Sequence, residues 1–193
     1  MKNENLKRCA WAEGHELNRI YHDTEWGTPL HDDRRLFEFL ILEGMQAGLS
    51  WLTILKKREN FRRAFDNFDP VKIARYRPAK INKLLQDEGI IRNRLKIEAA
   101  VKNAAAYLQI VREHGSFESF IWQFVGGRPI INRWKKLNEI PTSTVQAKDM
   151  SKALKAYGCN FVGPTICYAF MQATGMVNDH EIGCFRHSEV QKH

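Results

Sequence analysis

Apolar residues recur at the three- and four-residue spacing of helices along most of the chain. One stripe includes Leu36 and Leu40, with Asp33 at the position of a helix N-cap. The longest helix is expected from about Arg92 to His114. No apolar–polar alternation of strand length accompanies these stripes, so the pattern predicts an all-α fold. The other residues expected to begin or end helices are Ser50, Asp69, Pro70, Pro78, Gly89, Gly115, Ser116, Gly126 and Gly127.

The last third of the chain carries a different signal. One helix, with Leu154 inward, is expected to end at Gly158, and Pro164 opens the next, which runs to Gly175. Two helices joined by a tight turn with glycine at both ends describe a helix-hairpin-helix, near residues 151–175. Gly163 and Pro164 leave the first N–H groups of the second helix free, which makes a phosphate-sized anion site. An ordinary turn between two helices has the same sequence pattern.

Length and composition set the class of protein. The 193 residues are 44% hydrophobic and 27% charged, which predicts one compact unit over residues 1–193. No stretch approaches the roughly 20 apolar residues of a membrane span and no signal peptide opens the chain, so a cytoplasmic protein is expected. The 30 Lys and Arg residues against 22 Asp and Glu give a charge of +8. This excess favours a polyanionic partner such as nucleic acid, although many basic proteins bind none.

Cysteine and histidine residues gather near the two ends of the chain. Cys9 and His22 lie near one end, and His180 and Cys184 lie four residues apart near the other. Two thiolates and two imidazoles make the closed tetrahedral set that zinc prefers, but single Cys and His residues more often serve packing. Two further cysteines, Cys159 and Cys167, do not make the chain a disulfide scaffold. Histidines that could compete for the metal are His15, His31, His187 and His193.

Glu43 stands on an apolar helical stripe, seven residues after Leu36 and three after Leu40. Buried carboxylates are rare unless paired, and they often mark sites. A glutamate near a helix end can instead turn into solvent. Several aromatic residues lie near it in sequence, and such a cluster can hold a flat, cationic heterocycle or simply form core. These aromatic residues are Trp11, Tyr21, Trp26 and Trp51.

Taken together, these motifs resemble the type I 3-methyladenine DNA glycosylases of the helix-hairpin-helix superfamily. The resemblance runs in order over residues 8–184, which is nearly the whole chain. The matching segments are 8–11, 21–23, 25–27, 42–43, 46–51, 55–59, 89–92, 140–143, 161–163, 165–168, 177–180 and 183–184.

The resemblance implies a monomeric enzyme that removes 3-methyladenine from alkylated double-stranded DNA and binds no membrane. It implies a helix-hairpin-helix glycosylase fold in which one structural Zn²⁺ ties the N- and C-terminal segments together. The ligands of that ion would be Cys9, His22, His180 and Cys184.

The same resemblance assigns roles around the base. Glu43 would be the catalytic residue and would contact the flipped base, which would stack against Tyr21 and Trp51. Trp11 would line the pocket. The residues implied to contact DNA are Gly48 and Leu49, at the gap left in the duplex, and Gly163 and Thr165, at a phosphate.

The chemistry of the lesion fits this assignment. Methylation at N3 makes adenine cationic, so the glycosidic bond is already weak and no strong acid is needed. Bifunctional relatives use a hairpin lysine, whereas residues 163–166 here contain none, so a monofunctional enzyme is expected. Asp179 falls near an Asp of those relatives but adjoins His180, where it could instead orient the metal ligand. No matching motif is found after Cys184, so the role of this tail is open. The alternative is a non-catalytic, zinc-stabilised DNA-binding module, which would not need Glu43 on a buried stripe.

Overall fold

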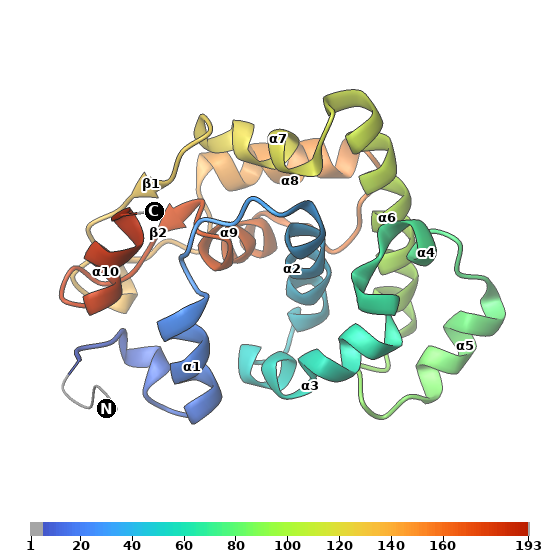
Figure 1. The fold of residues 1–193 in the computed structure, drawn as a ribbon, viewed down its shortest axis with the longest axis horizontal. Coiled ribbons are helices and arrows are strands. Elements are labelled where there is room, and N and C mark those ends of the chain that lie inside the picture. Colours follow the sequence, from blue (N-terminus) through green and yellow to red (C-terminus); the bar gives the residue numbers. More distant parts are fainter. Residues whose placement is uncertain (1–5, 193) are drawn as a thin grey trace.

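A computed structural model describes residues 6–192 and shows a helical protein (Figure 1). The α-helices are α1 (Glu16–Thr24), α2 (Asp33–Gln46), α3 (Trp51–Ala64), α4 (Pro70–Ile73), α5 (Pro78–Gln86), α6 (Arg94–His114), α7 (Phe117–Trp122), α8 (Val145–Ala156), α9 (Pro164–Ala173) and α10 (Phe185–Glu189). Short 3-10 turns are η1 (Ala10–Ala12), η2 (Asp66–Phe68), η3 (Gln123–Val125), η4 (Leu137–Glu139) and η5 (Val190–Lys192).

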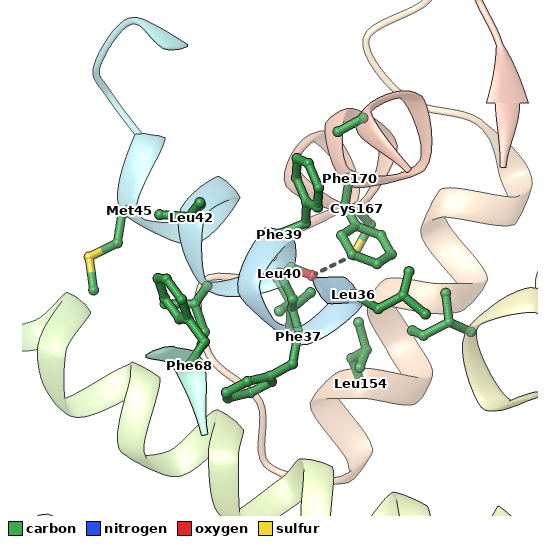
Figure 2. Packing of buried hydrophobic residues seen from close by; sticks show 14 of the residues in the cluster. Leu36, Phe37, Phe39, Leu40, Leu42, Met45, Phe68, Leu154, Cys167 and Phe170 are labelled. Atoms are coloured by element: carbon green, nitrogen blue, oxygen red, sulfur yellow. Dashed lines mark hydrogen bonds between the residues drawn. The ribbon is translucent and has the colours of Figure 1, made fainter. Parts of the chain in front are cut away.

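Helix α2 runs through the middle of the molecule (Figure 1), and every residue from Leu36 to Met45 is buried. A helix buried on all sides needs neighbours on all sides, and α3, α6, α7 and α9 pack against it. Figure 2 shows Phe37 and Phe39 of α2 among side chains from other elements, including Phe170. Two carboxylates, Glu38 and Glu43, are carried into the interior with the apolar residues.

One predicted helix cap is wrong. Asp32, and not Asp33, caps α2 by accepting a hydrogen bond of 2.8 Å from the Arg35 backbone N–H. The Asp33 carboxylate instead accepts from the backbone N–H groups of Phe117 and Glu118, at 3.0 and 2.7 Å. It therefore satisfies the first turn of α7, because these N–H groups have no partner within their own helix.

Most of the other predicted boundaries agree with the structure. Ser50 caps α3, Asp69 caps α4 ahead of Pro70, and Ser116 caps α7. Helix α6 ends at Gly115, whose φ of 84° closes the last turn. Helix α5 ends at Gln86, three residues before the glycine that was expected to stop it.

The expected helix pair in the last third is present as α8 and α9. At the end of α8 the backbone N–H of Cys159 donates to the Leu154 carbonyl and that of Gly158 to the Lys155 carbonyl, at 3.0 and 2.9 Å. This is a Schellman turn, and Gly158 takes the φ of 88° that it requires. The chain then reverses, and α9 begins at Pro164 and packs against α8.

A pair of two-residue strands joins the loop after α7 to the segment before α10. Strand β1 (Ile130–Ile131) lies parallel to β2 (Val177–Asn178). Strands this short leave no alternation to detect, and the fold remains all-α as predicted. Within residues 6–192, no helix is both long enough and apolar enough to cross a bilayer.

Candidate functional site

A cavity of about 360 Å³ opens between α1, α2, α3 and α9. Its volume is in the range of small-molecule sites. Asn18 and Tyr21 reach it from one face of α1, Glu43 from α2 and Trp51 from the first turn of α3. The full lining is Trp11, Asn18, Tyr21, Trp26, Glu43, Gln46, Ser50, Trp51, Leu52, Leu137, Ile140, Ala169 and Gln172.

Aromatic rings line this cavity. The ring centroids of Tyr21 and Trp51 lie 5.4 Å apart with a 45° angle between the planes. Trp11 lies 6.4 Å from Tyr21 and meets Trp26 edge-on at 5.1 Å. Trp51 is backed in turn by the ring of Phe39, nearly parallel at 6.5 Å. Such a surface suits a flat, electron-poor ligand, which gains both stacking and cation–π attraction.

Glu43 is buried, with 3% of its surface exposed, so it does not turn into solvent. Its Oε2 atom has no hydrogen-bond partner. Burial raises the pKa of the carboxyl group from 4.5 to about 8, because no cation lies close enough to offset the lost hydration. The empty pocket therefore favours the neutral carboxyl group at pH 7, and a cationic ligand would favour the carboxylate.

Unpartnered polar atoms gather in the same place. Over residues 6–192, six buried side-chain N or O atoms lack a hydrogen-bond partner, and four of them belong to residues that line the cavity. Each such atom costs about 1–3 kcal/mol when nothing binds it. This concentration is what a site built for a polar ligand requires. The four atoms are Asn18 Oδ1, Tyr21 OH, Glu43 Oε2 and Trp51 Nε1.

Asn18 is the member of this set that sequence reasoning missed. It precedes Tyr21 by three residues on α1, so both side chains leave the same face of the helix. That spacing was the available signal. The pKa of Tyr21 lies well above its usual value, first because of burial and then because of the carboxyl groups of Glu43 and Glu25.

The loop after α2 presents a small apolar tip beside the cavity. Gly48 has a φ of 77°, a left-handed conformation that favours glycine, and its surroundings are open. Leu49 is 42% exposed, so its apolar side chain is accessible at the surface. Because Gln46 and Ser50 on either side both line the cavity, this tip lies at its edge.

The start of α9 is a separate feature from the cavity. Gly163 is the N-cap residue and no side chain caps the helix, while Pro164 occupies the first helical position. Thr165 is exposed. The anion site that the sequence pattern predicts at the backbone N–H groups of this helix end stays a prediction.

The four predicted metal ligands come together. Cys9, His22, His180 and Cys184 are all buried, and their ligand atoms lie within 4.8 Å of one another. Cys9 Sγ lies 3.6 Å from His180 Nδ1, and Cys184 Sγ lies 3.4 Å from His22 Nε2 and 3.7 Å from His180 Nδ1. Bonds of 2.0–2.3 Å in a tetrahedron give ligand separations of about 3.5 Å, so this group could hold a metal ion.

The second nitrogen of each histidine has its own partner. His22 Nδ1 lies 2.8 Å from Asp23 Oδ1, and Asp23 is held in turn by Arg8. His180 Nε2 lies 3.1 Å from the Trp26 carbonyl oxygen. These contacts select the tautomers that leave His22 Nε2 and His180 Nδ1 free to bind a metal. A Cβ atom on Gly27 would lie 2.7 Å from His180 Nε2, so only glycine fits there.

The competing histidines are occupied elsewhere. His15 accepts a hydrogen bond from the Leu17 backbone N–H at the start of α1. His31 pairs with Glu118, and His187 lies 2.8 Å from the Asn132 carbonyl oxygen. His193 lies outside the described residues. The segment after Cys184 forms α10 and η5, and the Phe185 ring packs 6.1 Å from His22, so this tail covers the cluster.

Asp179 serves as a buried hydrogen-bond acceptor for several side chains. Its two carboxylate oxygens accept hydrogen bonds of 2.6–2.8 Å from four side chains. A carboxylate saturated in this way cannot also take a proton from water. One donor, Gln172, lines the cavity, so Asp179 orients part of the cavity wall. The four donors are Asn132, Trp134, Tyr168 and Gln172.

Known proteins share both the sequence and the fold. The methyladenine glycosylase family profile matches residues 11–187. DNA-3-methyladenine glycosylase 1 of Escherichia coli is 52% identical over 179 residues, covering 93% of this chain and 96% of the relative, and the Haemophilus influenzae enzyme is 50% identical over 92% and 96%. A crystal structure of 3-methyladenine DNA glycosylase I superposes with a TM-score of 0.91 at 52% identity, covering 93% and 98%. The chain belongs to the methyladenine glycosylase family.

Proposed function

We propose that this protein is a DNA glycosylase that hydrolyses the N-glycosidic bond of 3-methyladenine in alkylated double-stranded DNA. Relatives at 50–52% identity carry this name, and the structure of one relative at 38% identity is described as a complex with 3-methyladenine. The observation that carries the proposal is the cavity lined by aromatic rings, in which four buried polar atoms have no hydrogen-bond partner within the protein.

Stacking and charge would hold the flipped base. The rings of Tyr21 and Trp51 supply faces for a flat cation, and Trp11 closes the wall beside Tyr21. Glu43 offers Oε2 to the exocyclic amino group of adenine. Two solved relatives are variants, one with a tyrosine changed to phenylalanine and the other with a glutamate changed to glutamine. The sequence separation between that tyrosine and that glutamate equals the separation between Tyr21 and Glu43 in this chain.

The reaction needs little acid catalysis. The base leaves as neutral 3-methyladenine with the electron pair of the glycosidic bond, and water adds to C1′ and gives up a proton. Positive charge moves from the base to the sugar in the transition state, so a carboxylate at Glu43 would favour both cations. Excluding bulk water from the cavity strengthens that attraction.

DNA contacts would come from two segments outside the cavity. We place Leu49, with Gly48, at the gap that the flipped nucleotide leaves in the duplex, because an exposed apolar tip stands at the cavity edge. We place a phosphate at the start of α9, at Gly163 and Thr165, in a helix-hairpin-helix arrangement.

We further propose that the enzyme is monofunctional. No lysine is among the residues that line the cavity. Lys96 is buried nearby but its ammonium group donates to two backbone carbonyls, so its nitrogen is not available as a nucleophile. The cavity and the Cys–His cluster are complete within one chain, which supports action as a monomer.

We propose zinc as the ion for the Cys–His cluster, because two thiolates and two imidazoles are a ligand set that suits it. All four positions would be filled by the protein, so the ion would serve structure. When bound it would tie η1 and α1 to the segment before α10 and so support the cavity wall formed by Trp11 and Tyr21.

A single assay tests the proposal. Purified protein is incubated with duplex DNA that contains radiolabelled methylated bases, and the released bases are separated by chromatography. Release of 3-methyladenine in preference to 3-methylguanine and 7-methylguanine is expected. Duplex binding without release of any base would support the non-catalytic DNA-binding module, which the unpartnered polar atoms of the cavity disfavour.

A further inference from the structure

We propose that α6 is a brace that sets the distance between the two DNA-contacting segments, and that Lys96 and Asn103 are its positioning residues. The segments are the loop 46–50, here called the wedge loop, and the turn 158–163, here called the hairpin turn. The inference rests on the proposed function, because it concerns how these two segments meet one duplex.

Lys96 holds the wedge loop. Its ammonium group donates hydrogen bonds of 2.8 Å to the Met45 carbonyl and 2.6 Å to the Ala47 carbonyl. These groups end α2, where carbonyls lack helical partners and the helix dipole is negative. Lys96 is only 7% exposed, and burial lowers its pKa. Because this buried ammonium group donates to both carbonyls, it fixes the point at which the wedge loop leaves α2.

Asn103 holds the hairpin turn in the same way. Its side-chain N–H donates to the Asn160 carbonyl at 3.0 Å, and its side-chain oxygen accepts from the Asn160 backbone N–H at 2.8 Å. These two hydrogen bonds hold both the carbonyl and the N–H group of the Asn160 backbone. Asn103 is 3% exposed, so the pairing is protected from water.

The two residues lie on one face of the same helix. They are seven positions apart, which is close to two turns and about 10.5 Å along the axis. Phe161 of the hairpin turn packs against Gly44 of α2, where an added Cβ atom would lie 3.3 Å from the Phe161 Cβ. A small cavity of about 10 Å³ is lined by residues of α2, α6 and the hairpin turn, among them Lys96, Asn103 and Phe161, so the three elements meet at this point. Figure 1 shows α6 running beside α2.

Neither positioning residue lines the base cavity. Because only Gln46 and Ser50 of the wedge loop line the cavity, we expect the two positioning residues to affect duplex binding more than binding of the free base. A duplex presents its phosphates and its base gap at fixed distances, so one segment can be engaged correctly only if the other is in place. Small misplacements of positioned groups are costly, since a shift of about 1 Å can lower a rate about a hundredfold.

The test separates duplex binding from base binding. In Lys96→Met and Asn103→Leu we expect the Kd for a duplex carrying an abasic-site analogue, and the KM for methylated duplex, to rise about tenfold or more. The affinity for free 3-methyladenine, measured by tryptophan fluorescence, should fall much less than the duplex affinity, because Tyr21 and Glu43 lie outside the wedge loop and only Gln46 and Ser50 of that loop line the cavity. Lys96→Arg keeps the charge and donors and should restore much of the duplex affinity.

Ile110→Val is the matched control, since Ile110 is a buried residue of α6 with no bond to either segment. Its Tm and duplex affinity show how much affinity is lost when α6 is destabilised without any change to the two segments. Wild-type duplex affinity in both variants, or a loss of base affinity in step with Tm, would overturn the proposal. If Lys96→Met fails to fold, Lys96→Gln takes its place under the same criteria. A wild-type protein that binds duplex but releases no base would instead remove the proposed function, while the duplex measurements still decide the brace.

Discussion

Cys184 Sγ lies 3.4 Å from His22 Nε2, although 162 residues separate them in the sequence. With Cys9 and His180 they bring the two ends of the chain to one point. We expect the purified protein to contain about one zinc ion per chain. Cys184→Ser should lose the metal and lower the Tm, as measured by mass spectrometry of the metal and by calorimetry. Cys159→Ser, a change at a buried cysteine outside the cluster, should keep the ion. Stoichiometric zinc in Cys184→Ser would contradict the ligand assignment.

The monofunctional mechanism predicts no covalent intermediate with DNA. Borohydride added during the reaction should trap no complex, and the strand at the abasic site should stay uncut. Both follow because no lysine lines the cavity and the Lys96 nitrogen is engaged with carbonyls. Gel electrophoresis under denaturing conditions reads both outcomes. A trapped adduct that disappears in Lys96→Met would show that this lysine is a nucleophile after all.

Asn18 should contribute to base binding. Its Oδ1 atom is buried in the cavity wall without a partner, so Asn18→Ala removes an acceptor that only a ligand can satisfy. We expect affinity for free 3-methyladenine to fall about fivefold, equivalent to about 1 kcal/mol, with no loss of Tm. Arg19→Ala, at an exposed position on the same helix, is the control. Unchanged affinity in Asn18→Ala would remove this residue from the site.

These residues show what the sequence could predict. The apolar stripe through Leu36 and Leu40 placed Glu43 in the interior, as its helical spacing predicts, but it did not show that α2 is buried on all sides. The same local rule could not choose between Asp32 and Asp33 as the cap. That choice depends on α7, more than 80 residues away in sequence, whose N–H groups bind Asp33.

Two polar residues escaped prediction for a related reason. Asn18 and Lys96 belong to types that usually stand in solvent. The one sequence signal near Asn18, its three-residue spacing from Tyr21, gives its helix face but does not show what covers it. Lys96 is buried because α2 ends beside it, and Asn18 lines a cavity because α3 and α9 complete its walls. The strands β1 and β2 were too short to leave any pattern. Tertiary contacts decide all of these features.

Burial of Glu43 should make stability depend on pH. Its pKa is about 8 in the folded protein and near 4.5 when exposed, so the folded state holds a proton that the unfolded state has lost between these values. The stabilisation is complete below about pH 4.5 and is lost as pH rises toward 8. Glu43→Gln removes this dependence. In urea unfolding, the stability of the variant relative to wild type should rise by up to about 4 kcal/mol between pH 5 and pH 8.5, since each unit of pKa shift corresponds to about 1.4 kcal/mol. A constant difference between the two proteins would contradict the raised pKa.

Trp51 and Glu43 should have separable roles in the cavity. The Trp51 ring attracts any flat cation and does not distinguish one base edge from another, and such stacking contributes about 1–3 kcal/mol. Trp51→Ala should therefore weaken binding of free 3-methyladenine and slow excision of every methylated base alike. In the proposed complex Glu43 would accept a hydrogen bond from the amino group of adenine, whereas guanine derivatives would present a carbonyl oxygen at that position, which a carboxylate repels.

Glu43→Gln keeps the shape of the side chain, loses the charge and can turn an N–H group toward that carbonyl oxygen. It should lose an interaction of about 1.5–3 kcal/mol with 3-methyladenine, which slows excision of that base. It should also narrow the preference for 3-methyladenine over 3-methylguanine. The deciding measurement is the ratio of the two excision rates in wild type, Trp51→Ala and Glu43→Gln under single-turnover conditions. We expect that ratio to change in Glu43→Gln and to hold in Trp51→Ala. If the ratio and the 3-methyladenine rate both stay at wild-type values in Glu43→Gln, then Glu43 does not read the base.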